Sequence, residues 1–462
     1  MDSSLQSRMT SLAYSHANFS FISMIIINTL FFSGYYILKG PLAFILTTQG
    51  ISLRQAYSIT TSANTLLALS SLFFGFILQN CSKQKFALLA GIFLSVLSIY
   101  LLSFKNKELN MFAITLYVMG GGLYFFNIVM FINKVFHDEQ ARIKGNYIYQ
   151  IFVNLGGVLG CVLVLMQMNQ ENIFKYCFIL GVLSLSLFIS LYKNIDDPSK
   201  NKTNLSKFFL YLIILFFLIY AALNFASFLR YVVLFVFLTT VICLIIKAKI
   251  ESSRALLLFV FLVILFNIPY WIANTIIFNQ FFYFLMKNVT PMHGFSPASL
   301  IMIDPIVNAI FGSSLLFWQK NRIICHYNNL SYSSLLASAA FMVLCLGLIS
   351  SAAKEKINFL YPLIALSFFA CSEFLLQTTL NSRIRDLLHA QKNNEFLATG
   401  MMRSSRAFAT VLGYYLILLS APAANPNDAH TNLSLYCIMA VIFISSYLGF
   451  TYLNKTRWLK FI

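Results

Sequence analysis

Charged residues are scarce in this chain: they make up 10% of its 462 residues, whereas hydrophobic residues make up 59%. So few charges cannot keep a protein of this size in solution, which excludes an ordinary soluble domain and predicts a membrane protein. The formal net charge of +18 does not indicate nucleic-acid binding, because no basic cluster with interleaved aromatic residues is present. The polar segment 1–18 lacks a cleavage-site pattern, so we expect no cleaved signal peptide.

Motifs for catalysis and for metal binding are also missing. The eight cysteines are scattered, mostly in apolar runs, with no CxxC or Cys/His spacing, so we interpret them as small buried residues. No paired-carboxylate, Ser/His/Asp or metal-ligand spacing occurs, and the six histidines lie in or beside expected loops. Gly120, Gly121 and Gly122 lie in an apolar run, which favours helix packing over a phosphate-binding loop. We therefore expect no enzyme, no cofactor and no bound metal.

Long hydrophobic runs are the main feature that is present. About twenty apolar residues cross the hydrocarbon core of a bilayer as a helix. Runs of that length divide along the chain into six, two and six, which predicts an all-α polytopic protein with 14 transmembrane helices. The expected spans are 20–46, 54–79, 84–103, 109–133, 145–168, 173–192, 207–226, 230–247, 255–284, 296–318, 331–352, 357–382, 397–420 and 432–453.

The pattern predicts two six-helix bundles joined by a two-helix insertion. The expected domains are a tail at 1–19, a bundle at 20–192, a linker with two helices at 193–254, a bundle at 255–453 and a tail at 454–462. With the N-terminus inside, the cytoplasmic segments contain 21 Lys and Arg residues, the opposite face 8 and the membrane three. This bias predicts that both termini are cytoplasmic. It also explains the positive net charge as a signal of membrane orientation rather than of a binding partner.

Five ionisable side chains interrupt runs that are otherwise apolar: Lys39, Asp304, Glu373, Arg403 and Arg406. A charge within the bilayer costs at least a few kcal/mol unless it faces a polar cavity or a partner. A chain that keeps both signs at this depth is typical of a transporter with a water-filled site. We therefore expect a small zwitterionic substrate and the lipid bilayer as partners, and protons as a further candidate.

Two groups in the first bundle leave alternatives open. Tyr36 and Lys39 share a helix face and would suit a carboxylate, or Lys39 extends to water while the tyrosines form an interfacial belt. Gln150 and Asn154 also share a face, and their amides either bind a substrate or tie two helices together. The small residues Gly156 and Gly160 predict a close helix contact.

The second bundle offers a similar choice. Asp304 and Glu373 either face the site or form salt bridges that lock the bundles, with Arg403 or Arg406 as partners. The two arginines are three residues apart near the cytoplasmic start of their helix, and we interpret them as a structural or gating pair. Pro269 and Pro305 lie within or near helices and predict bends, which are tolerable only beside protein or a wet cavity.

Short motifs follow one another along the chain: Tyr35-Tyr36 with Lys39, Gly120-Gly121-Gly122-Leu123 with Asn127, Gly145 through Asn154-Leu155-Gly156, Gly294-Phe295-Ser296 with Asp304-Pro305, Ser372-Glu373-Phe374-Leu375, and Ala409-Thr410-Val411-Leu412-Gly413. In order and spacing they resemble motifs of the proton-dependent oligopeptide transporters, a branch of the major facilitator superfamily. The resemblance covers nearly the whole chain, including the two extra helices of bacterial members. It implies a major facilitator-type fold and a peptide symporter in a bacterial inner membrane.

The resemblance also implies roles for individual residues. In the family, the first-helix tyrosines, the cation after them and the fifth-helix Asn bind hydroxyl, carboxylate and amide groups, and these positions are Tyr35, Tyr36, Lys39 and Asn154 here. The tenth-helix Glu of the family takes the peptide amino group, and that position is Glu373.

The chain departs from the family where the family carries proton coupling. The acidic and basic residues of the first-helix motif E-x-x-E-R are replaced by Asn28, Phe31 and Phe32. The fourth-helix Lys becomes Phe125, and the seventh-helix Glu becomes Thr275. The eleventh-helix Trp appears as Arg406 and the second-helix Asp as Gln79. The coupling motif is thus eroded, and transport is either uncoupled or coupled through Asp304 and Glu373.

Taken together, the sequence predicts a transporter that moves di- or tripeptides, or amino-acid-like zwitterions, by alternating access. One alternative is a transporter of another amphoteric metabolite, such as a siderophore, because the family motif is so eroded. The other is a non-transporting membrane receptor derived from a transporter. Loss of coupling residues fits the receptor, but opposite charges retained within the membrane argue against it.

Overall fold

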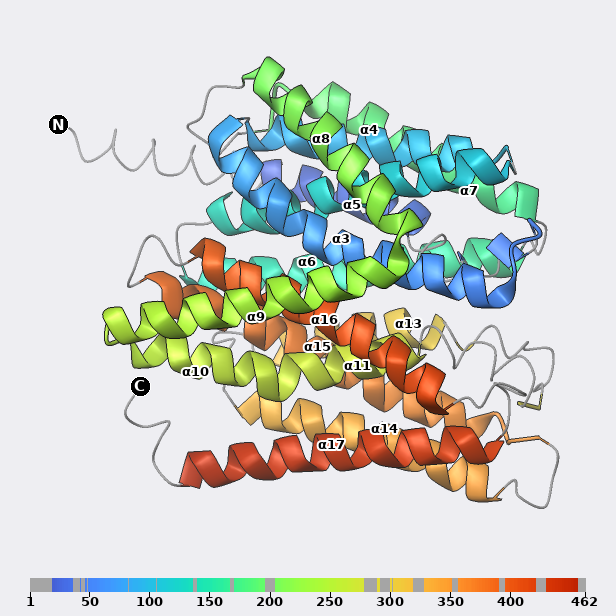
Figure 1. Cartoon of the computed structure of the whole chain (residues 1–462), viewed down its shortest axis with the longest axis vertical. Coiled ribbons are helices and arrows are strands. Elements are labelled where there is room, and N and C mark those ends of the chain that lie inside the picture. The colour runs from blue at the N-terminus through green and yellow to red at the C-terminus, as the bar shows by residue number, and fades with distance from the viewer. Residues whose placement is uncertain are drawn as a thin grey trace. The chain divides into compact units, whose positions relative to one another are not determined.

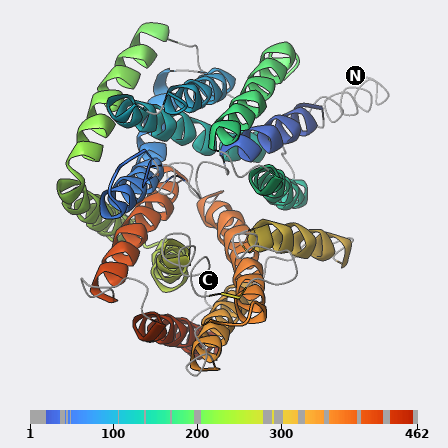
Figure 2. The ribbon, with the colours of Figure 1, turned by 90° about the vertical axis from the view of Figure 1, so that its right-hand side faces the viewer.

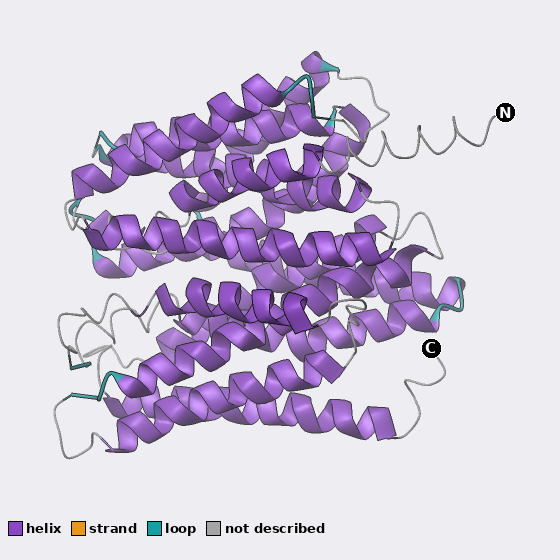
Figure 3. Cartoon of the chain, turned by 180° about the vertical axis from the view of Figure 1, so that it is seen from behind, coloured by secondary structure: helices purple, strands orange, loops and turns teal. Residues whose placement is uncertain are grey.

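The structure is a computed structural model. Its described residues are mainly helical (Figure 3). They also form turns and one isolated β-bridge, between Val289 and Ile357. It describes residues 19–35, 42, 46–47, 49–81, 83–104, 106–135, 139–166, 170–195, 204–277, 289–290, 300, 302–318, 328–350, 356–389, 395–420 and 429–455.

Fourteen helical segments lie at the fourteen expected positions of the described chain, which confirms the all-α fold class. Nine of these helices are long and apolar enough to cross a membrane. The segments are Phe19–Tyr35, α3 (Leu53–Cys81), α4 (Gln84–Leu102), α5 (Lys107–Val135), α6 (Glu139–Met166), α7 (Gln170–Leu191), α8 (Leu205–Asn224), α9 (Ala226–Ile250), α10 (Arg254–Leu262) continued by η1 (Val263–Asn267) and α11 (Ile268–Ile276), α13 (Ile303–Trp318), α14 (Asn328–Ser350), α15 (Leu360–His389), α16 (Glu395–Ser420) and α17 (Ala429–Lys455) (Figure 1).

Some helix ends predicted from apolar runs are wrong. Helix α6 begins at Glu139 rather than 145, and α15 continues to His389 rather than 382. Apolar runs stop where polar residues begin, but a helix can extend past the bilayer into water. Helix α15 also begins late, at Leu360, because Ile357 pairs with Val289 in the isolated bridge.

The chain divides into two compact units, each built of helices that pack along their lengths (Figure 2). Unit 1 comprises Met1–Ala56, Ser70–Phe225 and Lys320–Ile323. Unit 2 comprises Tyr57–Leu69, Ala226–Gln319 and Ile324–Ile462. Helix α8 of the insertion thus belongs to unit 1 and α9 to unit 2. The domain boundaries expected from the sequence stay a prediction.

Helix α5 is deeply buried in unit 1, with 83% of its apolar window buried. It packs on α4 at backbone distance, because a Cβ atom at Gly91 would lie 2.9 Å from the carbonyl oxygen of Gly120. Ser98 Oγ of α4 also donates to the Ala113 carbonyl of α5 at 2.6 Å. Small residues that let helices approach this closely are typical of membrane proteins. This contact confirms that the glycines at 120–122 serve helix packing.

The core of unit 2 forms where α14 packs between α15 and α17. Phe341 of α14 is fully buried and contacts the rings of Phe369, Tyr436 and Phe443 at 6.3, 5.9 and 6.1 Å between centroids. Serine hydroxyls add short polar contacts, such as Ser333 Oγ donating to the Ser372 carbonyl at 2.8 Å. These contacts fix α15, the helix that contains Glu373.

The helix that runs from Arg254 to Ile276 contains a π turn at Val263–Asn267. The N–H of Ile268 donates to the carbonyl of Val263, five residues earlier. Pro269 follows directly and has no N–H, so it cannot donate to the carbonyl four residues before it. At Pro269, where the sequence predicts a bend, the structure has a π turn, a feature frequently found at functional sites.

The two helices of the insertion are the most exposed of the long apolar helices, with 17% of the α8 window and 22% of the α9 window buried. In unit 1, Phe216 of α8 packs on Phe112 of α5 at 4.9 Å between centroids. In unit 2, Phe237 of α9 stacks on Phe408 of α16 at 4.5 Å. The remaining exposed apolar side chains are what helices that face lipid require.

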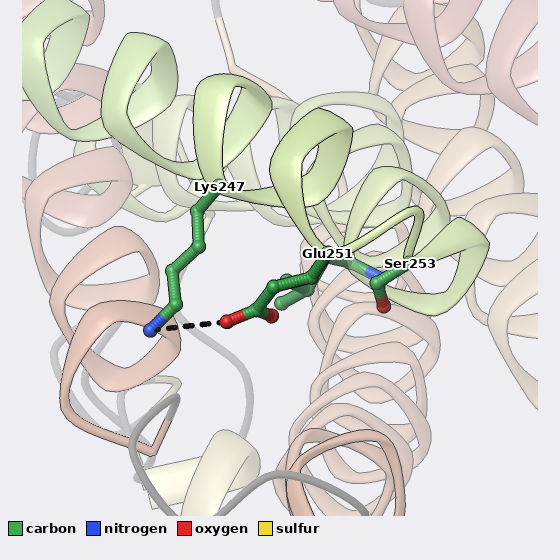
Figure 4. A network of polar contacts seen from close by, with 4 residues as sticks. Lys247, Glu251 and Ser253 are labelled. Carbon is green, nitrogen blue, oxygen red and sulfur yellow. Dashed lines mark hydrogen bonds and ion pairs between the residues drawn. The ribbon is translucent and has the colours of Figure 1, made fainter.

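A tight turn joins α9 to α10 within unit 2 (Figure 4). Ser252 adopts a positive φ of 48°, and the Ser253 N–H donates to the Ala248 carbonyl at 2.8 Å. Ser253 Oγ then accepts a hydrogen bond from the Leu256 N–H at 3.4 Å and caps α10. Lys247 and Glu251 form an ion pair at 3.8 Å beside this turn, and both side chains are partly exposed.

Candidate functional site

The structure places the predicted site residues in two groups, one in each unit. Tyr35, Gln150 and Asn154 lie in unit 1. Tyr36 and Lys39, the predicted carboxylate-binding pair, lie outside the described residues. The acidic and basic candidates of the second bundle all lie in unit 2: Asp304 on α13, Glu373 on α15, and Arg403 and Arg406 on α16.

Tyr35 lies in a group of rings that we call the aromatic cluster: Phe31, Phe32, Tyr35, Tyr117, Tyr124 and Phe125. The ring of Tyr35 stacks on Tyr117 at 4.5 Å and meets Phe125 edge-on at 4.6 Å. Phe31 contacts Tyr124 at 4.1 Å, and Phe32 contacts Phe125 at 5.0 Å. The residues that replace the family's first- and fourth-helix charges therefore touch one another as rings.

Helix α6 presses closely against this part of unit 1. A Cβ atom at Gly156 would lie 2.7 Å from the Thr29 carbonyl and 3.1 Å from Phe32 Cβ, so only glycine fits here. This confirms the close helix contact predicted from the small residues of α6. Beside it, the buried amide of Asn28 accepts a hydrogen bond from the Tyr124 hydroxyl at 3.1 Å.

The two amides predicted on α6 lie one turn apart. Asn154 is buried, and its Nδ2 donates to the Gln150 carbonyl of its own helix at 2.8 Å. Gln150 is half-buried. Because Asn154 Nδ2 donates to a carbonyl of its own helix, this hydrogen bond does not join two helices. A binding role for Asn154 and Gln150 stays a prediction.

In unit 2, three helices bring polar side chains together in a group that we call the polar cluster: Tyr270, Asn274, Asp304, Asn308 and Glu373. The Tyr270 hydroxyl accepts a hydrogen bond from Asn274 Nδ2 at 3.3 Å and lies within electrostatic reach of the Glu373 carboxylate. Asp304 lies within electrostatic reach of the same hydroxyl. Asn308 Nδ2 donates to Asp304 Oδ1 at 3.2 Å, one turn along α13. Both predicted acids thus approach one tyrosine.

Exposure differs between the members of the polar cluster. Asp304 and Asn308 are 6% and 1% exposed, whereas Glu373 is only half-buried. In the described part of the chain, no lysine or arginine forms an ion pair with Glu373. The structure therefore shows no salt bridge from Glu373 to Arg403 or Arg406, the locking alternative raised by the sequence. A half-buried carboxylate without a described counterion can accept a cation from outside the protein.

Arg406 lies over an aromatic ring instead. Its guanidinium carbon is 3.6 Å from the centroid of the Trp271 ring, a favourable cation–π distance. Trp271 Nε1 donates to Asn267 Oδ1 at 3.1 Å, and Asn267 Nδ2 donates to Ser405 Oγ at 2.8 Å. This chain of contacts fixes α16 on the π turn, whose last residue is Asn267.

Sequence reasoning missed Tyr270, Asn274 and Asn308. The signals were present but weak: Asn274 is four residues after Tyr270, and Asn308 is four residues after Asp304. Such spacing places side chains on one helix face. Tyrosine and asparagine occur in membrane helices for several reasons, so the sequence alone does not mark these residues as part of a site. Only the packing of α13 on α15 and the position of α11 identified them.

The sequence profile of the Major Facilitator Superfamily matches residues 24–414 of this chain. The chain belongs to this superfamily. Its members are transporters rather than enzymes, so the major facilitator fold and the transporter class predicted from the sequence are confirmed. Among curated protein sequences, none is significantly similar to the chain.

Solved structures of peptide transporters share the fold of this superfamily member. Tetrameric PepTSo2 superposes with a TM-score of 0.77 at 16% identity, covering 96% of this chain and 99% of the other. A bacterial homologue of the human drug peptide transporters PepT1 and PepT2 gives 0.76 at 15% identity, covering 94% and 96%. A POT family transporter in complex with 5-aminolevulinic acid gives 0.75 at 16% identity, covering 92% and 94%. At these identities the similarity shows the fold alone.

Proposed function

We propose that this chain is a proton-dependent oligopeptide transporter-like carrier of di- or tripeptides, or of amino-acid-like zwitterions, and that Glu373 binds the amino group of the substrate. One observation carries the proposal: Glu373 is a half-buried carboxylate in a membrane helix, within electrostatic reach of the Tyr270 hydroxyl and without a described basic partner. Placing a carboxylate this deep in a membrane costs free energy unless a cation binds to it.

The fold similarity supports the substrate class. The three solved structures above belong to proteins described as peptide transporters or their relatives, and one contains 5-aminolevulinic acid, which is an amino-acid-like zwitterion. In this proposal Lys39, with Tyr35, Tyr36, Gln150 and Asn154, binds the carboxylate and amide end. Arg403 and Arg406 serve as structural or gating groups, for which the stacking of Arg406 on Trp271 is the support.

We further propose a bacterial inner membrane with both termini in the cytoplasm, as the distribution of Lys and Arg indicates. The ligand would favour the occluded state only through its higher affinity for that state. Transport of another amphoteric metabolite is a second candidate, favoured by the aromatic cluster. This cluster has aromatic side chains at positions where the peptide-transporter family has charged side chains.

Uptake of radiolabelled alanyl-alanine into proteoliposomes tests the proposal. Glu373→Gln should weaken competition by substrates with a free amine about a hundredfold, because a partly desolvated charge loses its partner. Glu251→Gln, the same substitution on the exposed α9–α10 turn, is the matched control. Undiminished competition with folded Glu373→Gln protein would remove Glu373 from the site. Binding without accumulation would identify a receptor, and binding only of other metabolites would favour the second candidate.

Proton coupling is tested separately, with Asp304 and Glu373 as the proposed coupling groups. An imposed gradient, acidic outside and neutral inside, should accelerate uptake if either carboxylate carries a proton through the cycle. Asp304→Asn should then reduce this acceleration. A rate that does not respond to the gradient would assign facilitated diffusion.

A further inference from the structure

Asn308 has an unusual arrangement for a buried asparagine in a membrane helix. Its side chain is 1% exposed, and its Nδ2 donates to Asp304 Oδ1 at 3.2 Å. Among the described residues, none donates to Asn308 Oδ1. A buried carbonyl oxygen without a donor loses its hydrogen bond to water without replacement, so such atoms are rare and call for an explanation.

Asn127 and Asn224 show the ordinary arrangement, whereas Asn110 Oδ1 of α5 also has no donor among the described residues. Asn127 of α5 is equally buried, and its Nδ2 donates to the Leu123 carbonyl of its own helix. Asn224 Nδ2 of α8 donates to the Tyr220 carbonyl in the same way, at 2.8 Å. Asn308 instead holds a carboxylate, which fixes Asp304 and leaves its own carbonyl oxygen beside that carboxylate.

Asp304, whose Oδ1 accepts from the Asn308 amide, is an acceptor as well. Asp304 and Glu373 both lie within electrostatic reach of the Tyr270 hydroxyl. The polar cluster therefore contains three groups with oxygens that can accept from a ligand: Asp304, Glu373 and Asn308. A primary ammonium group has three N–H donors, one for each.

We infer that Asn308 is a third acceptor of the amine site, and that the site thereby selects primary over secondary amines. The inference rests on the proposed function and adds a specificity-determining residue to it. With three acceptors, replacing one N–H by a methyl group leaves Asn308 Oδ1 without a donor. With two acceptors, the two N–H groups of a secondary amine suffice.

The probes are alanyl-alanine, its N-methyl derivative and its N,N,N-trimethyl derivative, with dissociation constants measured on the full-length protein in detergent. The wild-type protein should bind the N-methyl peptide about tenfold more weakly than alanyl-alanine, the loss expected for one hydrogen bond to a charged group. In Asn308→Leu the two should bind equally. Asn308→Thr keeps an oxygen at this position and should restore the preference. Asn224→Leu is the matched control and should behave as wild type.

Each outcome decides the question. A preference that survives in Asn308→Leu would show that Asn308 is structural or binds only water, and the inference fails while the proposed function stands. Equal binding of both peptides by the wild-type protein overturns the inference without any variant, even if Asn308→Leu does not fold. Failure of the wild-type protein to bind any of the three peptides overturns the proposed function and the inference with it.

Discussion

Tyr35 in unit 1 and Tyr270 in unit 2 are both buried tyrosines on membrane helices, but their neighbours differ. Tyr35 lies among rings, with Tyr117 at 4.5 Å and Phe125 at 4.6 Å between centroids. Tyr270 also stacks on a ring, that of Phe369 at 5.2 Å, but its hydroxyl joins Asn274 and Glu373. Unit 1 thus uses its tyrosine to pack, and unit 2 uses its tyrosine to hold a charge.

The comparison shows where this chain has changed relative to the peptide-transporter pattern. Exchanging a buried ion pair for well-packed apolar side chains is often neutral or stabilising, because the desolvation cost of the charges disappears. Phe31, Phe32 and Phe125 are such an exchange in unit 1. Unit 2 has also lost one family carboxylate, at Thr275, but its helices still contain Asp304 and Glu373, which a purely structural bundle would have no reason to retain.

The largest effect is expected from truncating the aromatic cluster. Phe31→Ala should lower the free energy of unfolding by about 3 kcal/mol, because the ring is 3% exposed and its removal leaves a cavity. Phe32→Ala should cost less, since Phe32 is only half-buried. Thermal unfolding in detergent measures both variants. If both variants lost the same free energy of unfolding, Phe31 would contribute no more to the packing of the aromatic cluster than Phe32 does.

Tyr270→Phe should have a smaller effect on stability and a clear effect on binding. The ring keeps its stack on Phe369, so we expect a loss of only about 1 kcal/mol, that of one hydrogen bond. Glu373 loses a polar neighbour, so the affinity for alanyl-alanine should fall several-fold. If Tyr270→Phe lost as much stability as Phe31→Ala and still bound alanyl-alanine normally, Tyr270 would serve packing alone, as Tyr35 does.

The smallest effect is expected outside both clusters. Glu251→Gln removes the ion pair with Lys247. The Lys247 Nζ and Glu251 Oε1 atoms are 3.8 Å apart, and both side chains are partly exposed. Such a pair contributes less than about 0.5 kcal/mol, and salt screens it further. Thermal unfolding at low and high salt should therefore differ little between the variant and the wild type. A loss comparable to that of Tyr270→Phe would show that the α9–α10 turn depends on this pair (Figure 4).

Much of the fold was predictable because the bilayer fixes the length of a membrane helix. Runs such as 84–103 match α4 (Gln84–Leu102) within a residue at each end. The π turn at Val263–Asn267 was not predictable, because an extra residue in one turn leaves hydrophobicity unchanged where all faces are apolar. Only Pro269 indicated that the helix is disturbed there.

The site was predictable in part. Glu373 and Asp304 stood out because charge is rare in apolar runs. Tyr270 and Asn308 did not, since their importance comes from contacts between α11, α13 and α15 that no local pattern encodes. The replacements at Phe31, Phe32 and Phe125 were visible in the sequence, but their contact with one another was not. The roles of the site residues stay a prediction.

The five residues of η1 have a consequence for every side chain that follows them. Successive residues of a regular helix point about 100° apart around its axis, and the extra residue of a π turn adds one such step. Deleting a single residue between Val263 and Asn267 would restore regular winding and rotate Tyr270 and Asn274 away from Glu373. The position of Tyr270 relative to the Glu373 carboxylate thus depends on the number of residues in η1 as well as on their chemistry.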